Sequence, residues 1–576
     1  MNLIACLTLL LPLCPDSREA AAEGLVCRIQ RVEGGQGTVE VQLLLRGDPD
    51  GSTELSVSPE WGGVTDGSAD LSELSVRAAG DAGGDLPVEQ LEAHRWSVEH
   101  APGQALDLRY RIVVNDRQSS GDPSVHRGTI VTNTLFHGIG ELFLVMPEHM
   151  DAEQKARQSM EWVGFRESDE LAFSFGVGAG PHRFEASINE FRHSIFMGGA
   201  VKLMLREVWD KPLWIAVQDV SWGFDPEEFS ELAASIVDAQ RSFFDDFDRS
   251  FYLISMIPVG QAQPGSLSLG GTGLSQSFSL AVQPGFDLRR QAEAASGAYE
   301  QIVGLLAHEL FHDWNGMILQ RVQPEQLVYW FSEGFTDFYA RRLQLRNGFI
   351  EPEGYVKSLN DSLRRFHTSP VRAASNTRIL EEFWTDSNIS DLPYRRGDLV
   401  AMMLDHAIRL HSDGERSLDE LMRELVERGA KGWKMSTEET LQIIEAETSA
   451  EFAEVVRGIV VDGDLPVLDP ETFAPCLSLE MAEMQGFDIG FDVETSFAER
   501  IVQGVRPEGP AFAAGLRDGD VVRGGSYHVG DAQRPVEFQI DRDGKMRTIR
   551  FMPVGAAVAI QQFRLQPDAL EGCGIL

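Results

Sequence analysis

Short runs of apolar residues that alternate with polar ones dominate the first third of the chain. This pattern is typical of half-buried β-strands, and turns rich in Gly, Asp and Ser separate the runs. The clearest runs are 39–45, 96–98, 106–114, 129–132, 142–146 and 213–217. We therefore expect a β-rich, sandwich-like N-terminal domain.

Helical periodicity begins near residue 225. Asp225 is a good N-cap, Pro226 suits the first helical position, and apolar residues then recur every three or four positions as far as Phe243. The apolar run 251–257 predicts a buried strand. The glycine-rich stretch 268–277 follows, and because no Gly-Lys-Ser/Thr comes after it, it is not a phosphate-binding loop.

Several helices of the ordinary core-forming type are predicted in the second half of the chain. Their ranges are 395–411, 416–428, 437–446 and 450–459. The apolar stripe on the second of these helices is typical of packing and not of a cofactor site. The segment 465–475 contains prolines that break the helical pattern, so it predicts a linker.

Size and charge limit the functions that the chain can have. With 576 residues it is too long for a single hydrophobic core, so we expect about two to four domains. The formal net charge of −39 argues against nucleic-acid binding and against docking on an anionic membrane. Outside the N-terminus no stretch is long and apolar enough to span a bilayer. We therefore expect no nucleic-acid partner and no stable membrane span.

Residues 1–22 resemble a signal peptide. An apolar run that includes Cys6 and Cys14 has the length of a signal core, and Ala20–Ala22 fits a small-residue cleavage site, although basic residues are missing ahead of the run. We expect an exported protein, periplasmic or secreted if bacterial. A lipid anchor at Cys6 is left open as an alternative.

Three cysteines lie outside that segment: Cys27, Cys476 and Cys573. None is close in sequence to the motif described next, so none is a candidate metal ligand. Cys476 and Cys573 bracket the last predicted domain, and the chain ends of a domain usually lie close together. We therefore predict that these two cysteines pair in an oxidising compartment.

Candidate chemistry concentrates in the segment His308-Glu309-Leu-Phe-His312. The two histidines are four residues apart, so on a helix they project from one face and can share one Zn²⁺. Glu309 is then placed to accept a proton from a water molecule that the zinc acidifies. Only about 0.02 chance matches to H-E-x-x-H are expected in a chain of this composition. The apolar residues around the motif predict that its helix is buried on one side.

Glu333 is the candidate for the third metal ligand. Residues 313–332 are long enough for a loop that returns to a second helix, and the aromatic neighbours of Glu333 argue against a solvated charge. Glu325 is the alternative ligand. Asp337 lies four residues after Glu333 on the same helix face, where it could orient a ligand imidazole. We therefore expect a zinc site formed by two histidines and Glu333.

The sequence H-E-L-F-H-D-W-N, followed by W-F-S-E-G-F-T-D-F-Y, resembles the gluzincin metallopeptidases. The similarity is closest to the glycyl-aminopeptidase family that carries a C-terminal PDZ domain. It implies a multidomain α+β fold with an N-terminal β-sandwich-like domain, a thermolysin-like, mostly α zinc peptidase domain and a C-terminal PDZ domain. The expected boundaries are 1–22 for the signal peptide, 23–200 for the β-rich domain, 201–464 for the zinc peptidase domain, 465–484 for a linker, 485–560 for the PDZ-like domain and 561–576 for a C-terminal tail.

The PDZ resemblance depends on two segments. Ile489-Gly490-Phe491 resembles a carboxylate-binding loop, and residues 509–522 match the P-A-x-x-A-G-L-x-x-G-D segment of bacterial PDZ domains. The backbone N–H groups of such a loop hold a chain-terminal carboxylate while the bound peptide adds a strand to the sheet. A domain that only packs against the peptidase is an equal alternative.

The segment Pro393-Tyr394-Arg395-Arg396-Gly397, expected at the start of a helix, resembles the P-Y-x-K-G segment of the wider aminopeptidase family. The tyrosine of that family faces the zinc. The resemblance therefore makes Tyr394 the candidate donor to a developing oxyanion. A surface tyrosine without a catalytic role is the alternative.

The resemblance also bears on the substrate amine. Family aminopeptidases hold it with a glutamate in a glycine-rich segment before the zinc helix. Aligned on glycines, Ser275 stands at that position here, and a hydroxyl cannot neutralise an ammonium ion. We expect altered N-terminal selectivity, with internal cleavage left open. The candidate substrate-binding residues are Gly271, Gly273, Ser275 and Gln276.

As a whole, the sequence predicts a zinc-dependent, aminopeptidase-like metallopeptidase that acts on peptides with Glu309 as general base. Two alternatives remain. One is a non-catalytic, PDZ-containing peptide-binding protein, against which the intact motif argues. The other is a zinc hydrolase that acts on a non-peptide bond.

Overall fold

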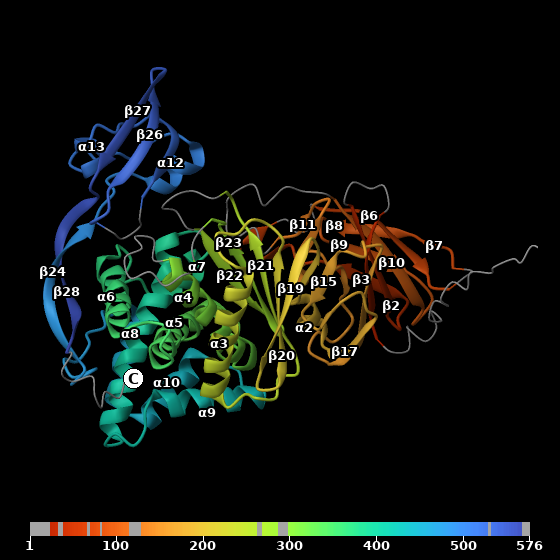
Figure 1. The fold of residues 1–576 in the computed structure, drawn as a ribbon, viewed down its shortest axis with the longest axis horizontal. Helices are drawn as coiled ribbons and strands as arrows, with labels where there is room; N and C mark the ends of the chain where they lie inside the picture. The colour runs from red at the N-terminus through yellow and green to blue at the C-terminus, as the bar shows by residue number, and fades with distance from the viewer. Residues whose placement is uncertain are drawn as a thin grey trace, which may run out of the picture. The chain divides into compact units, whose positions relative to one another are not determined.

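The computed structural model describes residues 24–32, 38–65, 70–80, 83–113, 128–261, 268–285, 288, 298–527 and 532–566. The expected signal segment, 1–22, lies outside these ranges. The chain divides into two compact units, 1–313 and 314–576. Figure 1 labels their helices and strands along the chain. Among the described residues, no helix combines the length and the apolar character that a membrane span requires.

The N-terminal part of the first unit is built from two β-sheets that share one apolar core. Their strands are β1 (Val26–Arg31), β2 (Val39–Arg46), β3 (Ser52–Ser56), β6 (Leu71–Ala78), β7 (Asp85–Leu86), β8 (Val88–Glu92), β9 (Arg95–Glu99), β10 (Ala105–Ile112), β13 (Met146–Pro147), β14 (Ala156–Val163) and β17 (His182–Ala186). One sheet has the order β17-β14-β1-β2-β10-β6-β7 and the other the order β13-β3-β9-β8. Buried residues of both sheets, such as Val41 and Val98, form the core, which also contains the free thiol of Cys27. The expected β-rich N-terminal domain is thus confirmed.

Two further sheets follow in layers. The third has the order β11-β12-β18-β15-β16, and the fourth has the order β19-β20-β21-β23-β22. Alternate residues of β18 point into different cores: Phe196 joins the first core, whereas Met197 joins a second one that lies against the fourth sheet. The strand bounds are β11 (Ile130–Val131), β12 (Leu135–Ile139), β15 (Glu170–Phe173), β16 (Gly176–Val177), β18 (Ile195–Gly199), β19 (Val201–Val208), β20 (Lys211–Gln218), β21 (Tyr252–Pro258), β22 (Leu269–Leu274) and β23 (Ser277–Val282).

Helices α3 (Pro226–Phe244) and α4 (Ala298–Phe311) pack on the fourth sheet, α4 along its edge strand β22. The start of α3 agrees with the sequence prediction, since the Asp225 carboxylate accepts a hydrogen bond from the Glu227 N–H at 3.0 Å. The glycine-rich stretch 268–277 is mainly this edge strand. The remaining small elements of the unit are β4 (Glu60–Trp61), β5 (Val64–Thr65), α2 (Ile188–Arg192) and the 3-10 helix η4 (Gly140–Leu142).

One predicted strand is wrong. The apolar run 142–146 forms the end of η4 and a buried turn, and only Met146 enters a strand. The Leu144 N–H bonds the Gly140 carbonyl at 2.8 Å, and the Tyr110 hydroxyl donates to the Phe143 carbonyl at the same distance. The run is apolar because it lies inside the core, and a short apolar run does not by itself distinguish a strand from another buried segment.

The second unit begins with helices. They are η5 (Asp313–Ile318, which starts on the last residue of the first unit), η6 (Glu325–Val328), α5 (Tyr329–Arg346), α6 (Pro352–Thr368), α7 (Asn376–Glu382), α8 (Ser387–His411), α9 (Leu418–Ala430), α10 (Thr437–Glu447), α11 (Ala450–Arg457) and η7 (Gly458–Asp462). The last four α-helices agree in number and order with the four that were predicted. Helix α8 starts earlier than expected because Asp386 caps it, with its carboxylate accepting from the Asn388 N–H at 2.8 Å.

The C-terminal part of the second unit has its own small core. Its elements are β24 (Leu477–Phe487), α12 (Val493–Glu499), α13 (Pro510–Ala513), β25 (Val521–Ser526), β26 (Val536–Arg542), β27 (Lys545–Phe551) and β28 (Val554–Leu565). The strands form a β25-β26-β27 sheet and a β24-β28 ribbon. The ribbon corrects two expectations, because β24 occupies the end of the expected linker 465–484 and β28 extends into the expected tail 561–576. Cross-strand pairing from Leu477 to Leu565 stabilises both segments as strands.

Cys476, directly before β24, is disulfide-bonded. Its predicted partner, Cys573, lies outside the described residues, so that pairing stays a prediction. The other domain boundaries given above also stay predictions.

Candidate metal centre

Helix α4 carries both histidines of the motif. His308 lies in its last turn, and His312 follows its last residue, Phe311. The two Nε2 atoms are 3.1 Å apart and the ring centroids 4.7 Å apart, so the two rings converge on one point. The rest of the helix is anchored through buried apolar residues. They are Ile302, Val303, Leu306 and Leu310.

Helix α5 carries the third predicted ligand, Glu333. One ligand atom from each of His308, His312 and Glu333 lies within 4.8 Å of the other two, and all three side chains are half-buried. In the part of the chain that the structure describes, no other group of three His, Cys, Asp or Glu residues is arranged in this way. The three residues predicted from spacing are therefore brought together.

The donor set fits a zinc ion. Two nitrogens that each lie about 2.05 Å from a tetrahedral zinc are about 3.3 Å apart, close to the 3.1 Å between the imidazole Nε2 atoms. Two histidines and one carboxylate from the protein are also the usual ligand set of a catalytic zinc that keeps a coordination position open. The side chains that would hold the metal are thus His308, His312 and Glu333.

Glu309 lies against the edge strand β22. It is half-buried, and its side chain passes close to the backbone of Gly271. Gly273, two residues further along the same face, lies near the Glu309 carbonyl oxygen and the His312 Cβ. The two glycines predicted to belong to the site therefore line the helix that carries the motif.

A buried ion pair fixes the chain directly after His312. Asp313 binds Arg249 with an O–N distance of 2.6 Å, and Arg249 also donates to Asp246 at 2.7 Å. Burial raises the pKa of the Asp313 carboxyl to about 6, against the opposing effect of the arginine. Sequence reasoning missed this pair, because Arg249 is 64 residues away from Asp313 and no local pattern connects them.

The other two acidic candidates both have arginine partners. Glu325, the alternative ligand, is outside the metal-ligand group and binds Arg321 at 3.0 Å. Asp337 accepts a hydrogen bond from Arg395 at 2.9 Å. This contact joins α5 to α8, and Arg395 is a site neighbour that the sequence prediction did not assign. The role of Asp337 towards a ligand imidazole stays a prediction.

Tyr394 lies within α8 and not at a helix start, which corrects the expectation from sequence. Pro393 also lies inside this helix. The backbones of α5 and α8 approach very closely beside Tyr394: a Cβ on Gly397 would lie 1.7 Å from the Trp330 carbonyl oxygen. The tyrosine is half-buried, and its role as an oxyanion donor stays a prediction.

Ser275 and Gln276 form the turn between β22 and β23. The Ser275 side chain is buried, and its hydroxyl has no hydrogen-bond partner among the described residues. Its backbone N–H donates to the His193 carbonyl at 2.8 Å. The ring of the same His193 contacts Glu141 at 2.8 Å, and the Ser58 hydroxyl also donates to Glu141. The carboxylate of Glu141 is thus already engaged.

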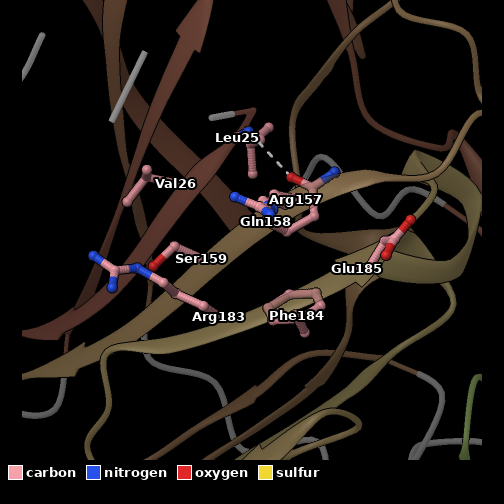
Figure 2. Close-up of a pocket in the computed structure, with 8 residues that line it drawn as sticks. All are labelled: Leu25, Val26, Arg157, Gln158, Ser159, Arg183, Phe184 and Glu185. Atoms are coloured by element: carbon pink, nitrogen blue, oxygen red, sulfur yellow. Dashed lines mark hydrogen bonds between the residues drawn. The ribbon is translucent and has the colours of Figure 1, made fainter. Parts of the chain in front are cut away.

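A separate pocket of about 410 Å³ lies in the seven-stranded sheet of the first unit (Figure 2). Figure 2 shows the Leu25 N–H bonded to the Gln158 side chain, with Arg157, Arg183 and Glu185 also at the pocket. The charged side chains belong to neighbouring positions of β14 and β17. None of the residues that line it is a metal ligand or a nucleophile with an adjacent base.

Residues 301–386 match the profile of a peptidase family described as M61 glycyl aminopeptidase. The matched segment contains both histidines, Glu309 and Glu333. Glutamyl aminopeptidase of Sus scrofa is 24% identical over 206 residues, and that of Homo sapiens is 26% identical over 208 residues. Each alignment covers 34% of this chain and 20% of the relative, so the chain spans only a fifth of these relatives' length.

The fold has a solved counterpart. An aminopeptidase N family protein from Idiomarina loihiensis superposes with a TM-score of 0.72 at 17% identity, and the match covers 95% of this chain and 99% of the other. This likeness shows the fold: a multidomain α and β architecture with a β-sheet N-terminal part and a helical part. Together with the matched segment, it confirms the predicted resemblance to gluzincin, aminopeptidase-like peptidases.

Proposed function

We propose that the protein is an aminopeptidase-like zinc metallopeptidase that hydrolyses peptide bonds. The observation that carries the proposal is the convergence of His308, His312 and Glu333 within 4.8 Å of one another, next to Glu309. The glycyl-aminopeptidase profile over 301–386 and the aminopeptidase-type fold support it. The proposed substrates are therefore peptides.

Each side chain has a proposed task. Zinc held by the three ligands would supply Lewis acidity for a peptide carbonyl and for a water molecule. Glu309 accepts the proton of that water and afterwards donates it to the leaving amine. Tyr394 donates a hydrogen bond to the oxyanion that develops on the substrate. Asp337 orients a ligand imidazole through its second ring nitrogen.

We further propose that selectivity for a free N-terminal amine is weakened or altered. Ser275, at the position where the family has a glutamate, offers only a neutral hydroxyl. Glu141, which is linked to the same turn through His193, is already bound by His193 and Ser58. Holding a buried ammonium ion without a paired carboxylate is costly in free energy. The proposal therefore includes cleavage at internal peptide bonds.

For residues 485–560 we propose peptide binding of the PDZ type. Gly490, in the loop that resembles a carboxylate-binding loop, has a φ of +81°, and a Cβ there would lie 2.9 Å from Pro510 Cδ. Only glycine suits that backbone conformation and spacing. The Arg506 side chain next to this loop is 60% exposed and forms an ion pair with Asp488. A purely packing role for this region is the alternative, and a peptide with a free C-terminus compared with its amide distinguishes the two.

Export is likewise a proposal and depends on the sequence of residues 1–22. Secretion or periplasmic location, with or without a lipid on Cys6, would be tested by fractionation and by the mass of the mature N-terminus.

The central experiment combines metal analysis with cleavage. We expect about one zinc per chain, cleavage of a peptide library, loss of cleavage with a chelator and recovery with zinc. A peptide and its N-acetylated twin should be cleaved at comparable rates if amine selectivity is weak. A chain that binds peptides but never cleaves them would favour the binding-protein alternative, and turnover of esters without peptides would favour the non-peptide hydrolase.

A further inference from the structure

The edge strand β22 passes so close to α4 that one of its glycines has no room for a side chain. A Cβ placed on Gly271 would lie 2.6 Å from the Cγ of Glu309, 2.9 Å from its Cδ and 3.1 Å from its Oε1. Ordinary contacts between carbon atoms are about 3.5–4.0 Å. The methylene and carboxyl groups of Glu309 therefore occupy the volume that a side chain at position 271 would need.

Backbone conformation does not require glycine at this position. Gly271 is absent from the glycines with positive φ, so alanine could adopt the same backbone. Gly273 is on the same strand face and has more space: a Cβ there would lie 3.5 Å from the Glu309 carbonyl oxygen and 3.5 Å from the His312 Cβ, which is ordinary contact. The close approach at Gly271 is thus specific to the Glu309 side chain.

Glu309 has few other restraints. Its side chain is half exposed, and no hydrogen bond or ion pair to a described residue holds its carboxylate. A glutamate has three rotatable side-chain bonds, and fixing them has an entropic cost. Among the described residues, the backbone surface at Gly271 limits where the carboxyl group can lie.

We propose that Gly271 is a positioning residue for the general base: the absence of a side chain there leaves Glu309 the space to hold its carboxylate against β22. The proposal depends on the proposed function, because it concerns the step that Glu309 performs. It differs from substrate binding by Gly271, which the sequence alone suggested. A positioning role changes kcat, whereas a role in holding the substrate in its ground state changes KM.

The test compares Gly271→Ala with Gly304→Ala, a substitution in α4 whose Cβ would have no atom within 4 Å. The Glu309 side chain is flexible, so Gly271→Ala should fold and keep its zinc, with the carboxylate displaced. A displacement of about 1 Å can lower the rate about 10²-fold. We expect kcat of Gly271→Ala to fall by about that factor with KM within about twofold of the parent, and Gly304→Ala to stay within about threefold in kcat. Parental kcat in Gly271→Ala, an equal loss in both variants, or a loss confined to KM would overturn the proposal.

A second measurement does not use activity. Thermal unfolding of the parent, Gly271→Ala, Glu309→Ala and the double variant forms a cycle that isolates the contact between the two positions. We expect the Gly271→Ala substitution to lower Tm more in the parent than in the Glu309→Ala background, where the clash is absent. Equal changes in both backgrounds would show that the two residues do not interact. If the parent cleaves no peptide, the proposed function fails, and the cycle still decides whether Gly271 positions Glu309.

Discussion

At the scale of single residues, some charged side chains of the site stabilise the fold, whereas others are available for the reaction. Asp313 is buried and ion-paired with Arg249, so it holds the backbone at the end of α4. Glu309 is half exposed and has no such pair among the described residues. Substitutions at Glu309 should therefore affect turnover and leave folding and metal content nearly unchanged.

The first prediction concerns Glu309→Gln. We expect kcat to fall by about 10²-fold or more, because an amide cannot accept a proton, while zinc content and Tm stay at the parental values. Steady-state kinetics, metal analysis and thermal unfolding measure these quantities. Glu300→Gln is the matched control, since Glu300 is an exposed acid in the first turn of the same helix and should keep full activity. Parental turnover by Glu309→Gln would remove this residue from the role of base.

The second prediction concerns Tyr394→Phe. If the hydroxyl donates to the oxyanion, its removal should lower kcat roughly 10²-fold and change KM little. The ring stays in place, so we expect an unchanged Tm. Kinetics on one peptide at several concentrations separate the two constants. A variant that keeps the parental kcat would identify Tyr394 as a tyrosine without a catalytic role.

At the scale of elements, the crossing of α5 and α8 connects several site residues. Glu333 and Asp337 lie on α5, Tyr394 and Arg395 on α8, and the pair Asp337–Arg395 joins the two helices at 2.9 Å. At the crossing, a Cβ on Gly334 would lie 2.3 Å from the Gly397 Cα. The helices can approach this closely only because both positions are glycine.

The third prediction tests this crossing. Gly397→Ala would place a Cβ 1.7 Å from the Trp330 carbonyl oxygen, and backbone cannot move aside as a flexible side chain can. We expect a loss of at least about 1–3 kcal/mol in the free energy of unfolding, measured in urea. Gly304→Ala in α4 is the control, because no atom lies within 4 Å of its Cβ position, and it should stabilise by about 0.5–1 kcal/mol. Equal stability of Gly397→Ala and the parent would contradict the tight crossing.

At the scale of the whole molecule, both the net charge and the proposed metal site can attract cations. The net charge of −39 attracts cations to the surface without a specific site. Specific zinc binding differs because it needs the folded arrangement of His308, His312 and Glu333. It should therefore stabilise the folded chain, whereas weak surface binding should depend strongly on ionic strength.

The fourth prediction follows from this difference. Zinc added to chelator-treated protein should raise Tm. At a free zinc concentration 100 times the Kd, binding should add about 2.7 kcal/mol to the free energy of unfolding. Differential scanning calorimetry at a moderate salt concentration measures the shift in Tm. The variant His308→Ala/Glu333→Ala keeps nearly the same surface charge and should show no rise. A rise of equal size in that variant would assign the metal effect to the surface.

The sequence alone determined the features that depend on local spacing. The four-residue step from His308 to His312 places both rings on one helix face, and Asp225 followed by Pro226 marks the start of α3, because both patterns act within one or two helical turns. The alternation of apolar residues likewise indicated most strands of the N-terminal part. The segment between His312 and Glu333 is long enough to bring Glu333 back to the two histidines, but its length does not require that contact.

Only the tertiary structure decided which distant segments meet. It brought Glu333 to the histidines, paired Asp313 with Arg249 and Asp337 with Arg395, and placed Gly271 against Glu309. It also showed that the apolar run 142–146 is a buried turn and that Leu477 begins a strand. Such contacts join residues tens of positions apart, and packing and cross-strand pairing select them. Local propensity contains no information about which partner a residue will find across the fold.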